Sequence, residues 1–149
     1  MQKIGLLAAV LISFVAAAPA SATGEAAKQP THATKSVHKL VLQVSDVDPG
    51  KWNLALNNAE NVQSDLGAKN VKIEIVAYGP GIGMLKSDSV VGNRIQDAIA
   101  AGIEVAACQT TMRKAKLTKD DMLPKLAYVP SGVVELMKRE REGYAYIRP

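Results

Sequence analysis

The 149-residue chain contains one cysteine, two histidines and few aromatic residues. A single cysteine cannot form a disulfide within the chain, and it leaves no C-x-x-C pair for dithiol exchange. The histidines, His32 and His38, both lie in or beside the amino-terminal segment, so they form no Cys/His cluster for zinc and no pair with a later cysteine. We therefore expect neither a metal site nor a cofactor.

Aromatic residues make up 4% of the chain, and the formal net charge is only +4. Proteins that stack nucleic-acid bases usually carry more aromatic side chains, and those that bind the phosphate backbone usually carry a basic arm or stripe. The sequence has neither feature, so we expect no nucleic-acid partner. With 48% hydrophobic and 21% charged residues, the composition is typical of one globular domain with its own core.

The first 37 residues have the pattern of targeting and leader segments. Lys3 precedes an uncharged apolar run over 4–18, and an Ala-Ser-Ala cleavage site follows, so 1–22 is predicted to be a secretory signal peptide. The run is shorter than the ~20 residues of a spanning helix, and Pro19 interrupts it, so we expect no stable membrane insertion after cleavage. Segment 23–37 lacks apolar periodicity and is predicted to be a disordered leader. We expect an exported, periplasmic protein.

Residues 38–149 are predicted to form one domain in which strands and helices alternate. Strands are expected at 39–45, 71–78, 103–107, 126–129 and 144–147, and helices at 51–66, 89–101, 117–123 and 133–142. This order predicts an α/β fold, a three-layer sandwich in which helices cover both faces of about five mostly parallel strands. Asp48 and Gly67 are the expected caps of the first helix.

The last predicted helix has two distinct sides. Val133, Leu136 and Met137 are expected to form its apolar side, because they recur at helical spacing. Its other side carries two candidate ion pairs of spacing i,i+4, which are Glu135 with Arg139 and Lys138 with Glu142.

Cys108 directly follows the predicted strand 103–107. In parallel α/β folds the ligand and reactive groups lie beyond the carboxyl ends of the strands, so the topology places Cys108 at that edge. Helix amino ends and the cations Arg113, Lys114 and Lys116 are expected to lower the pKa of the thiol, with its sulfur at least partly accessible. The alternative is a buried, inert cysteine that packs as a small hydrophobe.

The glycine-rich loop at 79–83 does not match a phosphate-binding motif. A dinucleotide fingerprint needs G-x-G-x-x-G after the first strand, and a P-loop needs glycine directly before its lysine, whereas Leu85 precedes Lys86 here. We expect Gly79 and Gly81 to let the backbone approach the site or a neighbouring subunit closely.

Four stretches carry a likeness to a known family: V-A-Y-G-P-G (76–81), A-G-I-E-V-A-A-C (101–108), V-P-S-G-V-V-E-L (129–136) and E-G-Y-A-Y-I-R-P (142–149). Through them the chain resembles the DsrE/DsrF-like family over nearly the whole predicted domain. The resemblance implies a parallel α/β fold that assembles into oligomers. In sulfur-relay members a cysteine at a strand end carries a persulfide and passes it to a partner, and Cys108 is the matching position.

Two functional hypotheses follow. In the first, the protein is a sulfur carrier: Cys108 takes sulfur from a donor, holds it as a persulfide and yields it to an acceptor thiol, without a cofactor. Gly79, Gly81, Gln109 and Thr110 would shape the site, and the partners would be a donor or acceptor protein or a small thiol. In the second, the protein is a non-catalytic oligomeric binding module for a small ligand or redox partner. A homo-oligomer is expected in both.

Overall fold

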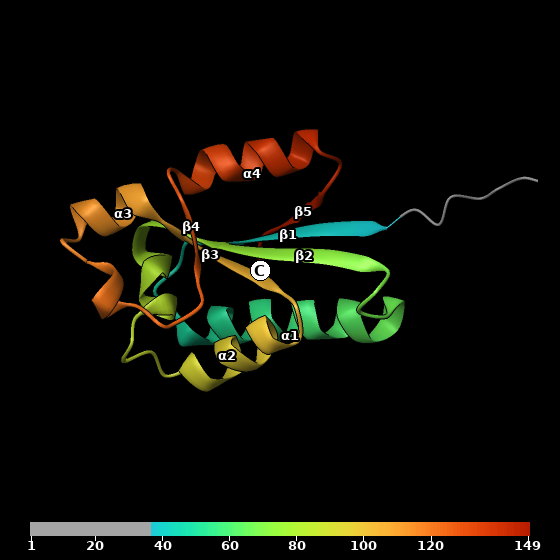
Figure 1. The fold of residues 1–149 in the computed structure, drawn as a ribbon, viewed down its shortest axis with the longest axis horizontal. Coiled ribbons are helices and arrows are strands. Elements are labelled where there is room, and N and C mark those ends of the chain that lie inside the picture. Colours follow the sequence, from blue (N-terminus) through green and yellow to red (C-terminus); the bar gives the residue numbers. More distant parts are fainter. Residues whose placement is uncertain (1–36) are drawn as a thin grey trace, which may run out of the picture. The chain divides into compact units, whose positions relative to one another are not determined.

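The computed structural model describes residues 37–149 (Figure 1). The predicted signal peptide, His32 and all of the predicted leader except Val37 lie outside the described residues. Within this part of the chain, no helix has both the length and the apolar character that a membrane span requires.

Five parallel strands form a single sheet. They are β1 (His38–Val44), β2 (Val71–Ala77), β3 (Glu104–Cys108), β4 (Ala127–Val129) and β5 (Ala145–Ile147). Their order across the sheet is β4-β3-β2-β1-β5, and every neighbouring pair is parallel. Strands β1 and β2 are buried over most of their length, as expected for central strands covered on both faces.

Helices cover both faces of this sheet (Figure 1). On one face lie α1 and α2, and on the other lies α4, with α3 beyond the carboxyl end of β3. Their bounds are α1 (Pro49–Leu66), α2 (Gly92–Ala100), α3 (Gln109–Lys114) and α4 (Gly132–Arg141). The predicted α/β fold with three layers is therefore confirmed.

Each face of the sheet has its own apolar core. The larger core packs α1 and α2 against the sheet and includes Leu42, Leu56 and Ile75. The smaller one lies on the α4 side and consists of Val41, Val76, Ala106, Val129 and Leu136. Alternate residues of β1 and β2 enter opposite cores, so these two strands are apolar throughout rather than alternating.

The ends of α1 are set by the residues that the sequence predicted. Asp48 is the N-cap, and its carboxylate accepts the N–H of Gly50 at 2.8 Å, with Pro49 in the first turn. Gly67 ends the helix with φ +82°, a conformation that favours glycine.

Three segments between the strands differ from the expectation. Helix α3 was not predicted, because Q-T-T-M-R-K has only one buried residue, Met112, and so no apolar period. The predicted helix over 117–123 shortens to the single 3₁₀ turn η2 (Lys119–Asp121), although Thr118 and Asp121 form a capping box at its start. The glycine-rich loop is a 3₁₀ helix, η1 (Gly79–Leu85).

Helix α4 buries Leu136, as predicted, but not the rest of its predicted apolar side. Val133 and Met137 are half exposed, whereas Glu135 is buried together with Leu136. A buried acid beneath the helix causes this rotation, because Arg139 turns toward the sheet and pairs with Glu74 of β2.

Arg139 is the centre of an ion-pair network. It pairs with Glu74, with Glu135 at 3.0 Å, with Glu142 at 3.2 Å and with Glu104 at 3.5 Å. The predicted Glu135–Arg139 pair is thus present, but Lys138 pairs with Glu135 rather than with Glu142. Burial raises the pKa of Glu74 more than Arg139 lowers it, and one oxygen of this carboxyl has no hydrogen-bond partner within the described residues.

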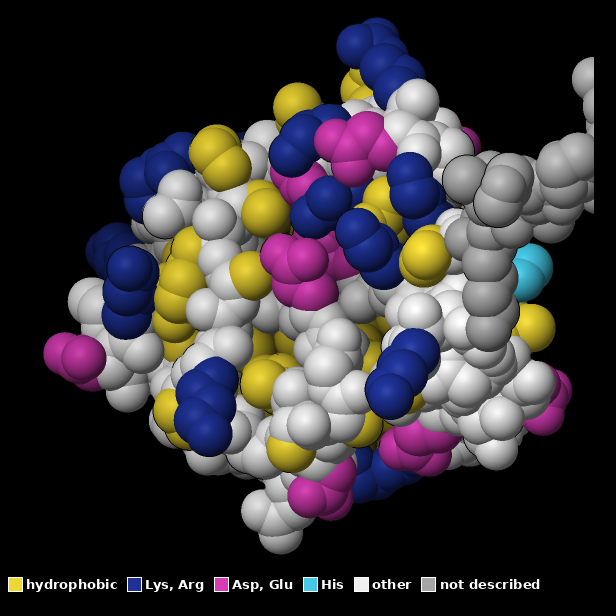
Figure 2. All heavy atoms as spheres, turned by 45° about the vertical axis from the view of Figure 1, so that its right-hand side comes forward, with side chains coloured by type: hydrophobic (Ala, Val, Ile, Leu, Met, Phe, Trp, Pro, Cys, Tyr) yellow, Lys and Arg dark blue, Asp and Glu magenta, His cyan; other side chains and the backbone are white. Residues whose placement is uncertain are grey.

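Charges of both signs are mixed on the molecular surface. On the face seen in Figure 2, lysine and arginine side chains are interspersed with acidic ones, and no continuous basic stripe crosses this face.

Candidate functional site

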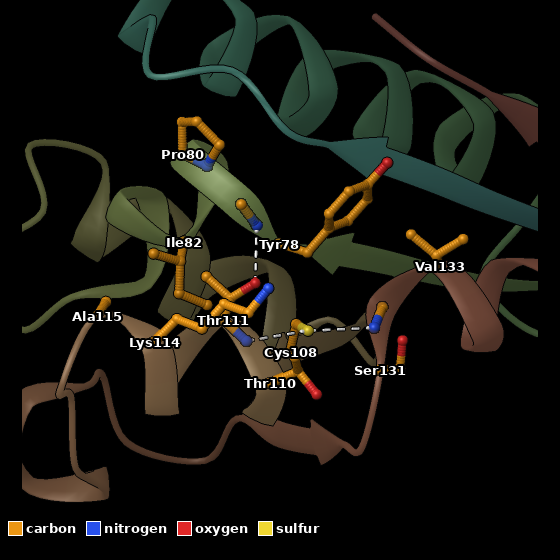
Figure 3. Close-up of a pocket in the computed structure, with 12 residues that line it drawn as sticks. Tyr78, Pro80, Ile82, Cys108, Thr110, Thr111, Lys114, Ala115, Ser131 and Val133 are labelled. Carbon is orange, nitrogen blue, oxygen red and sulfur yellow. Dashed lines mark hydrogen bonds between the residues drawn. The ribbon is translucent and has the colours of Figure 1, made fainter.

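A cavity of about 630 Å³ lies at the carboxyl ends of β2, β3 and β4 (Figure 3). Three segments that follow these strands form its walls, and they contribute Tyr78, Gly79, Pro80, Ile82, Cys108, Thr110, Thr111, Lys114, Ala115, Ser131, Gly132 and Val133. The cavity therefore occupies the edge at which parallel α/β folds place their ligands.

Cys108 lies between two helix amino ends in this cavity. It is the last residue of β3 and also the N-cap of α3. Its Sγ accepts the N–H of Thr111 at 3.4 Å and the N–H of Gly132, the first residue of α4, at 3.2 Å (Figure 3). The side chain is only 4% exposed, so the expected accessibility of the sulfur is wrong for this conformation. Its access to solvent runs through the cavity that it lines.

The surroundings of Cys108 favour its thiolate form. Burial raises the pKa of the thiol. Hydrogen bonds from Thr111, Gly132 and Thr110 together lower it by more than burial raises it, so the pKa lies below its ordinary value. The predicted direction is confirmed. The cause is hydrogen bonding at the amino ends of α3 and α4, rather than the charges of the nearby cations to which the sequence pointed.

Thr111 connects the sulfur to the turn after β2. Its Oγ1 accepts the N–H of Gly79 at 2.9 Å, and the same hydroxyl lowers the pKa of the Cys108 thiol. Gly79 has φ +53°, a left-handed conformation that favours glycine. Thr111 has no signal in the sequence, because no apolar period predicts the helix that orients it.

Gly132 allows α4 to begin directly against the site. A Cβ added here would lie 2.9 Å from the Cβ of Tyr78, so any larger residue would push the start of the helix away from Cys108. Tyr78 forms one side of the cavity (Figure 3), and burial raises the pKa of its hydroxyl. Tyr78 ends one predicted strand and Gly132 follows another, and both lie in stretches that carry the family likeness.

The structure brings together some of the predicted site residues but not all. Gly79 and Thr110 line the cavity, and the hydroxyl of Thr110 donates to the carbonyl oxygen of Pro130 at 2.8 Å. Gly81 does not line it. A Cβ at this position would lie 2.3 Å from the carbonyl oxygen of Val44, so Gly81 is required for close backbone packing.

Gln109 is also absent from the cavity wall. The first turn of α3 directs it into a second, smaller hollow of about 300 Å³, whose lining includes Met112, Lys119 and Tyr128. Thus α3 separates two neighbours in the sequence, Gln109 and Thr110, into different surroundings. His38 begins β1 and therefore lies at the opposite edge of the sheet from the cavity. Within residues 37–149, no three His, Cys, Asp or Glu side chains gather closely enough to hold a metal ion.

Comparison with known proteins gives a family and several related structures. The model of the DsrE/DsrF-like family matches residues 38–149. No curated protein matches the chain significantly. Among solved structures, MTH1491, a protein of unknown function from Methanobacterium thermoautotrophicum, is 33% identical, with a TM-score of 0.72 over 75% of this chain and 99% of that one.

Two more distant structures show the same fold. BT1422, a conserved protein of unknown function from Bacteroides thetaiotaomicron, is 17% identical with a TM-score of 0.62, over 74% of this chain and 94% of that one. The ychN protein from E. coli is 11% identical with a TM-score of 0.59, over 76% of this chain and 100% of that one.

Proposed function

The chain belongs to the DsrE/DsrF-like family, and we propose that it is a sulfur carrier in which Cys108 holds a persulfide and transfers it to a partner thiol. The family is associated with sulfur relay in general. One observation carries the proposal for this chain: the Cys108 sulfur lines an open cavity while two helix amino ends donate hydrogen bonds to it. A thiolate is the nucleophile of sulfur transfer, and these donors stabilise its negative charge.

The carrier cycle consists of two displacements at sulfur. In the first, the Cys108 thiolate attacks the outer sulfur of a donor, a new S–S bond forms, and the donor's leaving group departs with the electron pair of the broken bond. In the second, an acceptor thiolate attacks the terminal sulfur of the persulfide, and Cys108 leaves as a thiolate. In each step one bond to the transferred sulfur forms and another breaks, so neither step needs a redox cofactor.

The burial of Cys108 suits the second step. The S–S bond of a persulfide is about 2.05 Å long, so the terminal sulfur lies farther along the cavity than Sγ does. An acceptor thiol meets this outer sulfur without having to reach the buried one. Gly79, Thr110, Thr111 and Gly132 hold the walls around it.

We further propose that the mature protein is exported to the periplasm and forms a homo-oligomer. Strand β5 lies at one edge of the sheet with all its residues exposed, and such an edge is commonly covered by another chain. Val133, Val134 and Met137 of α4 also expose apolar surface on the opposite side of that helix from the core. Both features support assembly.

A second candidate function is a binding module in which Cys108 packs rather than reacts. The 4% exposure of Cys108 favours it, as does the apolar character of much of the cavity wall, where Pro80, Ile82 and Val133 lie. In this case the cavity would bind a small ligand or a redox partner's side chain.

The reaction with a polysulfide separates the two candidates. The protein without residues 1–22 is incubated with inorganic polysulfide, desalted and weighed intact by mass spectrometry. A carrier gains roughly 32 Da for each sulfur added to its thiolate, and the Cys108→Ser variant gains nothing. Loss of the added mass after a small thiol is added would demonstrate the second step, the transfer of sulfur from Cys108 to an acceptor. Wild-type protein that stays at its original mass, and whose cysteine is alkylated only after denaturation, would refute the carrier and leave the binding module.

A further inference from the structure

The cavity around Cys108 has a marked charge asymmetry. Lys114 is the one charged side chain among the described residues that line it, and no acid joins it. Within residues 37–149, Lys114 takes part in no ion pair. Next to it in the chain, Arg113 donates to the hydroxyl of Thr110 at 2.9 Å but lines the second, smaller hollow. The cavity therefore has a positive potential that favours an anion.

The start of α4 adds uncharged donors to the same cavity. Ser131 is its N-cap but its side chain caps no N–H group. The N–H of Gly132 donates to Cys108, and that of Glu135 to Ser131. The N–H groups of Val133 and Val134 have no acceptor among the described residues. The N–H groups of a first helical turn point toward the amino end of the helix, so these two face the side where the Cys108 sulfur lies.

The cavity beside Cys108 has room for a small sulfur donor. The Cys108 side chain is 4% exposed, at the wall of the cavity rather than on an outer surface. A free anion of a few atoms enters a space of about 630 Å³ and leaves room for its own leaving group.

We propose that the sulfur donor is a small inorganic sulfane anion of the thiosulfate type, held by Lys114 and the open N–H groups of α4 beside the Cys108 sulfur. This inference rests on the proposed carrier function and specifies its donor. The Cys108 thiolate attacks the outer sulfur of thiosulfate, the bond between the two thiosulfate sulfurs breaks, and sulfite leaves with its electron pair. The product is the Cys108 persulfide anion, so the total charge of −3 is the same before and after.

The expected role of Lys114 is to bring the anion to the thiolate, which carries the same sign of charge. The Lys114 side chain is exposed, so solvent screens its charge, and its removal is expected to slow the reaction with thiosulfate about threefold at physiological salt. The effect grows at low ionic strength. A neutral reagent has no charge for Lys114 to attract, so its rate is expected to stay the same.

The test compares Lys114→Gln with a control, Lys116→Gln. Lys116 lies two residues farther along the chain and does not line the cavity, so the control removes an equal charge from outside it. Persulfide formation from thiosulfate is followed by intact mass, and iodoacetamide labelling serves as the neutral control. The inference predicts that Lys114→Gln alone slows the thiosulfate reaction, with both variants labelled by iodoacetamide at the wild-type rate. It also predicts that added sulfate, an unreactive dianion, competes with thiosulfate in the wild type.

The other outcomes are distinguishable. Equal thiosulfate rates in both variants, without competition by sulfate, would overturn the anion site while the carrier function stood. A protein that is loaded by a persulfidated donor protein but not by thiosulfate would likewise refute the small-anion donor alone. Failure of Cys108 to accept sulfur from thiosulfate, polysulfide and a persulfidated protein would refute the carrier function, and the donor with it.

Discussion

Replacing Thr111 by valine removes a hydroxyl that accepts the Gly79 N–H and lowers the pKa of the Cys108 thiol, while the shape of the side chain is kept. A hydrogen bond to a charged group contributes about 1.5–3 kcal/mol, against about 0.5–1.5 kcal/mol to a neutral one. The thiolate therefore loses about 1.4 kcal/mol more than the thiol does. This is a factor of ten in the thiolate population at a pH below the titration midpoint, and the pKa of Cys108 rises.

The reaction rate changes less than the thiolate population. A thiolate of higher pKa is the stronger nucleophile, with a Brønsted coefficient of about 0.4–0.5, so part of the loss is recovered. The rate of Thr111→Val is expected to fall about threefold below the midpoint and to exceed the wild-type rate about threefold above it. A rate profile that crosses that of the wild type in this way is specific to a shifted pKa, because a collapsed or blocked cavity lowers the rate at every pH.

The assay measures the rate of reaction with hydroxyethyl disulfide, a small uncharged reagent, as a function of pH. The control is Thr110→Val, because that hydroxyl donates to the carbonyl oxygen of Pro130 and not to the sulfur. Thr111→Val also leaves the Gly79 N–H without its acceptor, which costs about 1–2 kcal/mol of stability, so urea unfolding is measured in parallel. A midpoint unchanged in Thr111→Val, or shifted equally in both variants, would refute the account of the thiolate.

Three further predictions concern packing, charge and assembly. Gly81→Ala is expected to lower the free energy of unfolding by about 3 kcal/mol, because its Cβ would meet the Val44 backbone. The control is Gly83→Ala, whose Cβ would have ordinary contacts 3.4 Å away, and equal losses of stability in urea unfolding would contradict the reasoning. Arg139→Met leaves Glu74 buried without its cation and is expected to cost about 3–5 kcal/mol, with partial recovery when Glu74→Leu is added; a double variant as unstable as the single one would argue against this. Light scattering at micromolar concentration is expected to give a mass above that of one chain, and a monomer across the whole range tested would exclude the proposed oligomer.

The titration of Glu74 makes its contribution to the stability of the folded protein depend on pH. Its pKa is raised in the folded protein, chiefly by burial, so the folded state binds a proton that the unfolded state has released. The contribution of Glu74 to stability therefore falls as the pH rises from its ordinary pKa to its raised one. Arg139 stays charged throughout, since its carboxylate partners raise its pKa against the effect of burial.

The fold follows from local patterns that can be read along the chain. The alternation of strand and helix patterns, the Asp48 and Gly67 caps and the apolar central strands depend on neighbours in sequence, and each predicted strand lies near its expected place. The position of Cys108 at the carboxyl edge follows from the parallel topology alone.

The site was only partly predictable, because its hydrogen bonds join residues far apart in the chain. The donor from Gly132 lies 24 positions from Cys108, and Thr111 and Gly79 meet across 32 positions. Helix α3 has no apolar period, since Met112 is its only buried residue, yet it decides that Thr110 faces the site and Gln109 does not.

Sequence by itself thus determined the family, through four stretches that resemble it. It also determined the layered fold and the reactive candidate, because these depend on periodicity, end signals and a single cysteine. Only the tertiary structure decided how the sulfur is held. Burial sets the cost of its charge, and the two helix amino ends that meet at Cys108 offset that cost. These opposing contributions depend on distances across the folded chain, which no local pattern specifies.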